Sequence, residues 1–276
     1  MKFLDIRPLM KAFGIKPKKS LGQNFLVEPE GLRKVIEAAG IKSDDQVLEI
    51  GAGLGSLTVL LAQLSRSVVA VEIDREIIPA LQQVLEKYPN VEIVQGDILQ
   101  QNPESLGLEA GYLVVANIPY YISSAILRHL LTTKKKPARM ILTVQKEVAE
   151  RICTAEGKHS LLSLSVQVFG KPSLAGIIPA NSFLPAPEVD SAVLVIDLYL
   201  QPAIPEEDLD RFFRLAKAGF SQKRKTLRNS LSGGMRISTQ EAEKLLGQAG
   251  LDPMLRAETL SLEAWGNLVK AFKNLD

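Results

Sequence analysis

Short apolar runs alternate with segments of helical periodicity between residues 31 and 198, and this alternation limits the possible folds more than any other feature. Each apolar run has the length and the Val and Ile content of a buried β-strand, and most are separated by segments with apolar residues at helical spacing. Alternating strands and helices are typical of a mostly parallel sheet with helices on both faces. We therefore predict an α/β domain over residues 1–200.

The expected elements follow from these patterns. Strands are expected at 46–50, 67–72, 91–94, 112–116, 139–144, 164–169 and 191–198. Helices are expected near 31–39, 55–64, 75–87 and 122–132. The last two strands have no clear helix between them, so we expect them to form an antiparallel pair at the sheet edge.

A second, purely helical region follows the linker Q-P-A-I-P at 201–205. Its apolar residues, such as Leu209 and Phe212, recur at helical spacing. We predict a small all-helical C-terminal domain over 206–276, whereas residues 1–30 show little periodicity and form an N-terminal arm of the first domain. A chain of 276 residues is long enough for one large and one small domain.

Composition excludes several classes of protein. The single cysteine, Cys153, excludes an internal disulfide, and with only two histidines we expect no metal site. No apolar run is long enough to span a bilayer, and the first residues lack the apolar segment of a signal peptide. We therefore expect a cytoplasmic protein.

Polar residues or glycines lie at the carboxyl ends of four successive expected strands: Gly51 and Gly53, then Glu72, Asp97 and Asn117. Ligands of open parallel sheets bind beyond the carboxyl ends of the strands. At this edge the Glu72 carboxylate can accept hydrogen bonds from both hydroxyls of a ribose, and Asp97 can accept one from an adenine amino group. The pattern predicts a site for a nucleoside-containing cofactor.

The segment E-I-G-A-G-L-G (49–55) joins the first expected strand to a helix. A dinucleotide fingerprint requires glycine at position 56, which is Ser56, and the third glycine is Gly55 instead. This spacing disfavours a nicotinamide dehydrogenase and resembles the G-x-G-x-G loop of S-adenosylmethionine-dependent methyltransferases. The resemblance implies a Rossmann-like class I methyltransferase sheet with S-adenosyl-L-methionine as cofactor. Taken alone, the loop also fits a tight strand-to-helix turn without a ligand.

Five further motifs narrow the resemblance. They are K-S-L-G-Q-N-F-L (19–26), N-I-P-Y-Y-I-S (117–123), Q-K-E-V-A-E-R (145–151), F-L-P-A-P-E-V-D-S-A-V (183–193) and F-S-Q-K-R-K-T-L-R-N-S-L (220–231). In this order they cover nearly the whole chain, which is identified as a member of the small-subunit ribosomal RNA adenine N6-dimethyltransferases. Membership implies dimethylation of two adjacent adenosines in the 3′-terminal hairpin of that RNA, on an immature particle. We also expect a monomer.

The N-I-P-Y segment has a chemical rationale of its own. An adenine amino group is a weak nucleophile because its lone pair is delocalised into the ring. Two acceptors, the side-chain oxygen of Asn117 and the backbone carbonyl of Ile118, can orient that lone pair toward the methyl donor. Pro119 stiffens the loop, and the ring of Tyr120 can stack on a flipped base, unless it is a core aromatic that caps the sheet.

Other roles come from the resemblance alone. It assigns Gln23, Asn24 and Leu26 to the methionine part of the cofactor, and Phe183 to the second face of the target base. The alternative for Phe183 is an ordinary core residue at the start of a strand. The segment H-S-L-L-S-L-S-V (159–166) departs from the family, which usually has a Tyr-Gly pair there.

The net charge of +2 is almost balanced, so RNA binding has to come from local basic clusters. Basic residues gather at 16–19, at 134–136 and at Lys223, Arg224, Lys225 and Arg228. If the last segment is helical, Arg224 and Arg228 share a face, which is mildly unfavourable unless an anion lies between them. We predict that the 223–228 cluster binds RNA phosphates.

Two alternatives remain open. The first is a large-subunit ribosomal RNA adenine methyltransferase of the macrolide-resistance type, although the segment K-R-K-T-L-R-N (223–229) favours the small-subunit enzyme. The second is a non-catalytic RNA-binding assembly factor on the same fold. The presence of Gly51, Glu72, Asp97 and Asn117 argues against lost catalysis.

Overall fold

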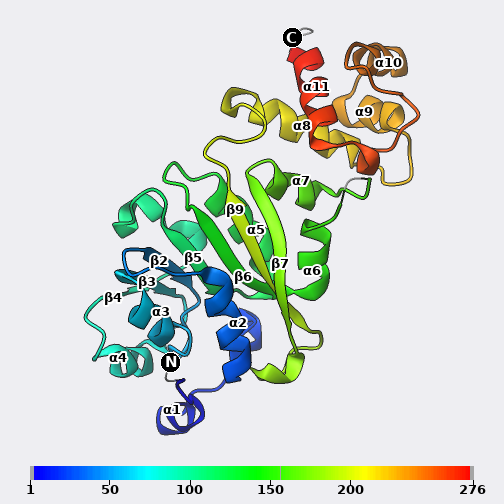
Figure 1. Ribbon diagram of the computed structural model, residues 1–276. Coiled ribbons are helices and arrows are strands. Elements are labelled where there is room, and N and C mark those ends of the chain that lie inside the picture. The colour runs from blue at the N-terminus through cyan, green and yellow to red at the C-terminus, as the bar shows by residue number, and fades with distance from the viewer. Residues whose placement is uncertain (1–2, 156, 274–276) are drawn as a thin grey trace. The chain divides into compact units, whose positions relative to one another are not determined.

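A seven-stranded sheet forms the centre of the computed structural model, which describes residues 3–155 and 157–273 (Figure 1). Its strands are β2 (Gln46–Ile50), β3 (Ser67–Glu72), β4 (Val91–Gln95), β5 (Leu113–Asn117), β6 (Arg139–Gln145), β7 (Gly170–Ile178) and β9 (Ser191–Leu198). The order across the sheet is β4-β3-β2-β5-β6-β9-β7. The five strands from β4 to β6 run parallel, and β9 runs antiparallel to β6. This confirms the predicted mostly parallel, Rossmann-like sheet.

Helices lie around the sheet, and three of them connect parallel strands: one between β2 and β3, one between β3 and β4, and one between β5 and β6. The helices around the sheet are α2 (Pro29–Ala39), α3 (Thr58–Leu64), α4 (Ile78–Leu85), α5 (Ser123–Leu131) and α6 (Lys146–Ile152). Helix α2 begins with Pro29 at its first position and is capped after Ala39 by Gly40, whose φ of 57° is left-handed. It packs against β5, β6 and β9, whereas α3 packs on β3 and α4 on β4. No described helix is both long and apolar enough to cross a membrane.

The strand predicted at 164–169 is wrong, because most of that segment is helix α7 (Leu161–Gln167). Ser160 caps this helix: its Oγ accepts a hydrogen bond from the backbone N of Ser163 at 3.1 Å, and Ser163 Oγ accepts one from the backbone N of Ser160 at 2.7 Å. Such a capping box satisfies two amide groups that would otherwise lack partners. The predicted antiparallel pair therefore does not form, and β9 instead lies between β6 and β7.

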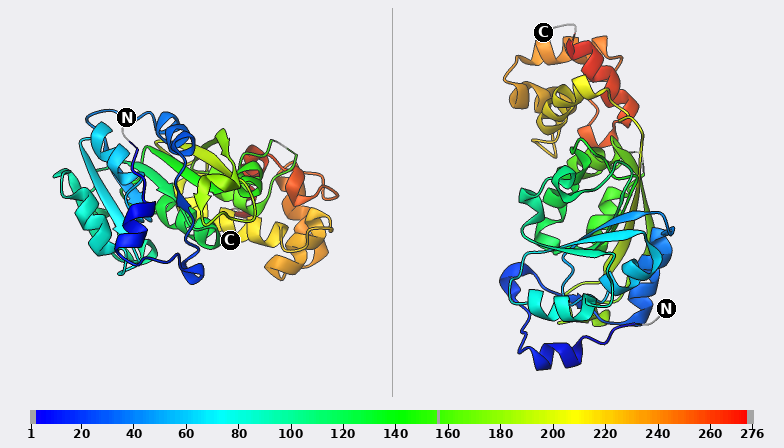
Figure 2. Two further views of the ribbon diagram at one scale, coloured as in Figure 1. Left: turned by 90° about the horizontal axis from the view of Figure 1, so that it is seen from below. Right: turned by 90° about the vertical axis from the view of Figure 1, so that its left-hand side faces the viewer.

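The N-terminal arm contains helix α1 (Arg7–Ala12), a 3₁₀ turn (Lys19–Leu21) and strand β1 (Phe25–Leu26). Figure 1 and the right-hand view of Figure 2 show α1 at the same end of the α/β unit as α4. Strand β1 pairs antiparallel with β8 (Phe183–Leu184), with Leu26 opposite Phe183. This pairing fixes the carboxyl end of the arm to the α/β unit.

The chain divides into two compact units, Met1–Ala149 with Pro172–Leu198, and Glu150–Lys171 with Tyr199–Asp276. The second unit contains α7 and the helices α8 (Leu209–Gly219), α9 (Leu227–Met235), α10 (Thr239–Gln248) and α11 (Leu262–Lys273). Its core includes Phe212 and Trp265, whose ring centroids lie 6.5 Å apart at 89°. The grouping differs from the expected domains in that Glu150–Lys171 joins the C-terminal helices.

Candidate cofactor and substrate site

The strand order reverses at β2, because β3 and β4 lie on one side of it and β5 and β6 on the other. In open α/β sheets this switch point opens a crevice beyond the carboxyl ends of the strands. A pocket lies there, formed by the arm, the glycine loop after β2, the end of β3 and the loop after β5. Its lining residues are Leu21, Gly22, Gln23, Asn24, Phe25, Gly51, Gly53, Glu72, Ile73, Asn117, Ile118, Pro119 and Tyr120.

The glycine loop requires glycine at two of its positions. Gly51 and Gly53 have φ values of 74° and 54°, in the left-handed region that other residues rarely adopt. A Cβ on Gly53 would also lie 3.1 Å from the ring of Phe25. The loop therefore keeps its backbone close to the pocket, as the sequence motif predicts.

Glu72 ends β3 with a buried side chain, only 4% exposed. Its carboxylate accepts hydrogen bonds from the backbone N of Gly53 at 2.7 Å and of Asp74 at 2.8 Å. Burial raises the pKa of Glu72, and these two bonds oppose the shift. Among residues 3–155 and 157–273, no basic side chain pairs with this carboxylate. A buried acid that faces a pocket without a cation suits a neutral hydroxyl donor such as a ribose.

Asn117 is the last residue of β5, and its side-chain orientation is fixed from the arm. Its Nδ2 donates a hydrogen bond to the backbone O of Asn24 at 2.9 Å. With Nδ2 bonded to the arm, Oδ1 remains available to accept a hydrogen bond at the pocket. The predicted role of Asn117, to orient an adenine amino group, requires such an acceptor.

Tyr120 lines the pocket and directly follows Pro119, at the start of a 3₁₀ turn (Tyr120–Ile122). Its hydroxyl and Ser191 Oγ share a hydrogen bond of 2.5 Å. Burial raises the pKa of Tyr120, and the bond with Ser191 opposes the shift. The hydroxyl is therefore anchored in the protein, and the ring is held where it lines the pocket.

Of the three arm residues assigned by resemblance, Gln23 and Asn24 line the pocket. Leu26 is buried in β1 and lines a smaller adjoining cavity together with Gly53 and Asn117.

Two further expected residues, Asp97 and Phe183, line neither the pocket nor the adjoining cavity. Asp97 Oδ1 accepts a hydrogen bond from the backbone N of Leu99 at 3.0 Å and caps a 3₁₀ turn after β4. Phe183 is 3% exposed and belongs to the hydrophobic core that also contains Leu26. The position of Phe183 in this structure matches the alternative interpretation of this residue, a core residue at the start of a strand.

The basic cluster differs from its expected geometry. Lys223, Arg224 and Lys225 are exposed in the connection between α8 and α9, and α9 begins only at Leu227. The condition under which Arg224 and Arg228 would share a helix face is therefore not met. Arg228 is on the helix, and its guanidinium pairs with the carboxylate of Glu243 in α10.

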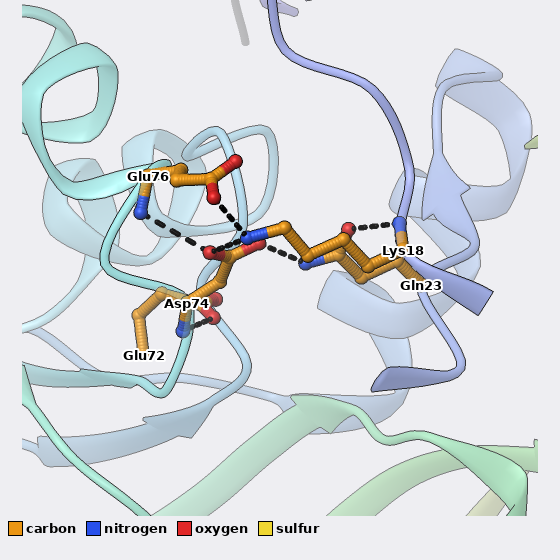
Figure 3. A network of polar contacts seen from close by, with 5 residues as sticks. All are labelled: Lys18, Gln23, Glu72, Asp74 and Glu76. Atoms are coloured by element: carbon orange, nitrogen blue, oxygen red, sulfur yellow. Dashed lines mark hydrogen bonds and ion pairs between the residues drawn. The ribbon is translucent and has the colours of Figure 1, made fainter. Parts of the chain in front are cut away.

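Sequence patterns missed two residues beside the pocket. Asp74 is buried two residues beyond Glu72, and Lys18, expected only as part of a basic cluster, pairs with it at 2.7 Å (Figure 3). The pair joins positions 56 residues apart, a distance over which no sequence periodicity extends. The only available signal was the second acid in E-I-D (72–74). Within residues 3–155 and 157–273, no group of three or more His, Cys, Asp or Glu side chains is placed so that it could hold a metal ion.

Solved structures share this fold over most of the chain. A dimethyladenosine transferase from Plasmodium falciparum superimposes with a TM-score of 0.75 at 28% identity, covering 91% of this chain and 98% of its own. The 23S rRNA methyltransferase ErmE superimposes with a TM-score of 0.72 at 26% identity, covering 91% of this chain and 100% of its own. The fold and the pocket define a class: the chain is an S-adenosylmethionine-dependent methyltransferase with a Rossmann-like sheet.

The sequence relatives then identify the family. The family model described as ribosomal RNA adenine dimethylase matches residues 14–274. A protein of Dehalococcoides mccartyi (strain CBDB1) named ribosomal RNA small subunit methyltransferase A is 44% identical over 266 residues, which are 95% of this chain and 90% of the relative. One of the same name from Enterococcus faecalis is 40% identical over 277 residues, 97% of this chain and 94% of the relative. The chain belongs to the ribosomal RNA adenine dimethylase family, whose members methylate ribosomal RNA with S-adenosyl-L-methionine.

Proposed function

We propose that this enzyme dimethylates N6 of two adjacent adenosines in the 3′-terminal hairpin of small-subunit ribosomal RNA. The observation that carries the proposal is that the N-I-P-Y loop and the buried Glu72 line one pocket. The relatives named small subunit methyltransferase A support the choice of subunit. We further propose that the enzyme acts as a cytoplasmic monomer on immature small subunits, as a step of ribosome biogenesis.

The residues around the pocket fit the cofactor. When bound, S-adenosyl-L-methionine supplies an electrophilic methyl group on a sulfonium. Glu72 would accept hydrogen bonds from the ribose hydroxyls, and the backbone of Gly51 and Gly53 would allow close approach. Asn24 and Leu26 lie on the arm side, suited to the methionine part. Asp97 remains a proposed acceptor for the adenine amino group because it follows β4 at the same sheet edge.

The substrate amine is oriented by two acceptors. Asn117 Oδ1 and the carbonyl oxygen of Ile118 accept its two hydrogens and direct the nitrogen lone pair toward the donor methyl group. The ring of Tyr120 stacks on the extruded base and holds its plane. No strong base is required, because the methylated nitrogen becomes acidic and loses its proton after transfer. A monomethylated amine retains one hydrogen, which one acceptor still orients for the second transfer.

A large-subunit target is the second candidate, favoured by the superposition on the 23S rRNA methyltransferase ErmE. The test uses purified small and large ribosomal subunits from cells that lack the modification, each incubated with the enzyme and a labelled methyl donor. We expect label in the small subunit alone, with mass mapping that finds two dimethylated adenosines in the 3′-terminal hairpin. Label confined to the large subunit would overturn the proposal, and no transfer to either would favour the non-catalytic assembly factor.

A further inference from the structure

A buried carboxylate outside the predicted site connects the arm to the cofactor pocket. Asp74 is 4% exposed and lies two residues beyond the end of β3 (Figure 3). Its Oδ1 accepts from Lys18 Nζ at 2.7 Å, and its Oδ2 accepts from Gln23 Nε2 at 2.8 Å. Both oxygens of one buried acid therefore hold the arm.

The same residue is bonded to Glu72. The backbone N of Asp74 donates a hydrogen bond to Glu72 Oε1 at 2.8 Å. Within the arm, Gln23 Oε1 accepts from the backbone N of Lys18 at 2.7 Å, so the two donors to Asp74 are also bonded to each other. Asp74 thus contacts the arm through its side chain and, through its backbone N, the carboxylate expected to bind the ribose.

A second attachment lies on the opposite side of the pocket. There Asn117 Nδ2 donates to the backbone O of Asn24. Leu21, Gly22, Gln23 and Asn24 line the pocket between these two attachments. The arm therefore forms a wall of the pocket that is held at the end of β3 and at the end of β5.

Electrostatics make the Asp74 attachment stronger than an ordinary surface ion pair. Although burial by itself disfavours the charged form, hydrogen bonds from Lys18 and Gln23 lower the pKa of Asp74, so it stays ionised. The Lys18 side chain is 31% exposed, but Asp74 is buried, so loss of Lys18 would leave a buried carboxylate without its cation, which is costly. Glu76 also pairs with Lys18, at 2.9 Å, but its side chain is 75% exposed, where an ion pair contributes little.

We propose that Asp74 is a positioning residue for methyl transfer: by holding Lys18 and Gln23 it keeps the arm closed on the cofactor pocket and sets how fast the cofactor leaves. The inference rests on the proposed function, because it requires the pocket to bind S-adenosyl-L-methionine. It assigns no contact between Asp74 and the substrate.

The test measures cofactor binding to the full-length protein and its rate of dissociation by rapid mixing, with S-adenosyl-L-homocysteine as the probe. In Asp74→Asn the charge is lost at constant shape, and we expect dissociation to become about ten-fold faster or more, because hydrogen bonds to a charged group are lost. Glu76→Gln should change the rate by less than about two-fold. Asp44→Asn, at an exposed acid in the loop before β2, serves as the matched control and should match wild type.

Two measurements separate positioning from general stability. In steady-state assays the KM for the cofactor should rise in Asp74→Asn, while the KM for RNA stays unchanged. Lys18→Met should release the probe as fast as Asp74→Asn does, whereas Lys18→Arg, which keeps the positive charge, should release it at nearly the wild-type rate. The double variant Lys18→Met with Asp74→Asn should release the probe no faster than Asp74→Asn alone.

If the wild-type protein does not bind the probe, the proposed function fails and this inference fails with it. If wild type binds but Asp74→Asn releases the probe at the wild-type rate, only this inference is overturned. Fully additive effects of Lys18→Met and Asp74→Asn would also overturn it, because they would show that the two residues do not act together.

Discussion

At the scale of single residues, the two polar atoms of the Asn117 side chain have different roles. Nδ2 holds the arm through Asn24, and Oδ1 is left for the substrate amine. In Asn117→Ala we expect cofactor affinity to fall only a few-fold, through loss of one neutral hydrogen bond. Methyl transfer should slow by roughly 100-fold or more, because the amine loses its orientation. Single-turnover assays at saturating cofactor test this, and near-normal transfer would refute the orienting role.

Tyr120 makes a different prediction because only its ring is needed for stacking. Tyr120→Ala should slow methyl transfer severely, whereas Tyr120→Phe should retain much of it. The Phe variant loses the bond to Ser191 Oγ, which holds the ring in place, so a moderate decrease is expected. The comparison uses the rate at saturating RNA and cofactor. A Phe variant as slow as the Ala variant would give the hydroxyl a chemical role.

How far the sequence predicts a site residue depends on whether a local pattern marks it. Gly51, Glu72 and Asn117 each follow an apolar strand, and a parallel sheet brings such positions together. Asp74 could not be found in this way, because its burial depends on partners in the distant arm. For Phe183 the sequence motif predicted a site residue, but in the structure its side chain is buried where β8 pairs with β1.

At the scale of elements, strands with continuous apolar sequence were predicted well, and β9 was predicted at its observed bounds. Strand β7 was missed because G-K-P-S-L-A-G-I-I contains two glycines and a proline. Such residues are unfavourable within a sheet but tolerated at its edge, and β7 is one of the two edge strands. Helix α7 was misread because L-S-L-S-V alternates like a strand, whereas the Ser160 cap that selects a helix lies upstream.

Strand β2 carries an acid whose ionisation should affect stability. Glu49 is fully buried, and burial, with a smaller contribution from the negative charge of Glu72, raises its pKa from 4.5 to about 8. Between these two values the unfolded chain releases the proton that the folded protein keeps. The stabilising contribution is therefore fully present below pH 4.5 and is lost as the pH rises through about 8.

Glu49→Gln removes this titration at nearly constant shape. The free energy of unfolding of the variant, relative to wild type, should therefore increase from pH 5 to pH 8, by at most about 1.4 kcal/mol per pH unit. Urea unfolding at each pH measures it, and other titrating groups cancel in the comparison. Parallel pH profiles for the two proteins would show that Glu49 does not titrate in this range.

At the scale of the whole molecule, a net charge of +2 gives almost no long-range attraction to RNA. RNA binding must then depend on local groups of Lys and Arg side chains that are not neutralised by acidic side chains. Lys18 and Arg228 both belong to predicted basic clusters, but acidic side chains pair with both of them. Lys223, Arg224 and Lys225 are instead consecutive and exposed between α8 and α9, so we expect them to be the better phosphate ligands.

Each phosphate contact that these three residues make should contribute about 0.7 to 0.9 to the slope of log affinity against log salt. We therefore expect the triple Ala variant at 223–225 to bind small-subunit RNA more weakly and to have a slope smaller by up to roughly 2 to 3. Arg228→Ala is the matched comparison, because Glu243 neutralises the guanidinium of Arg228 in the wild type. The salt slope of this variant should therefore differ from the wild-type slope by less than about 0.7, the contribution of one phosphate contact. Both variants should hold S-adenosyl-L-homocysteine as wild type does. An unchanged slope in the triple variant would mean that the RNA is bound through other basic residues.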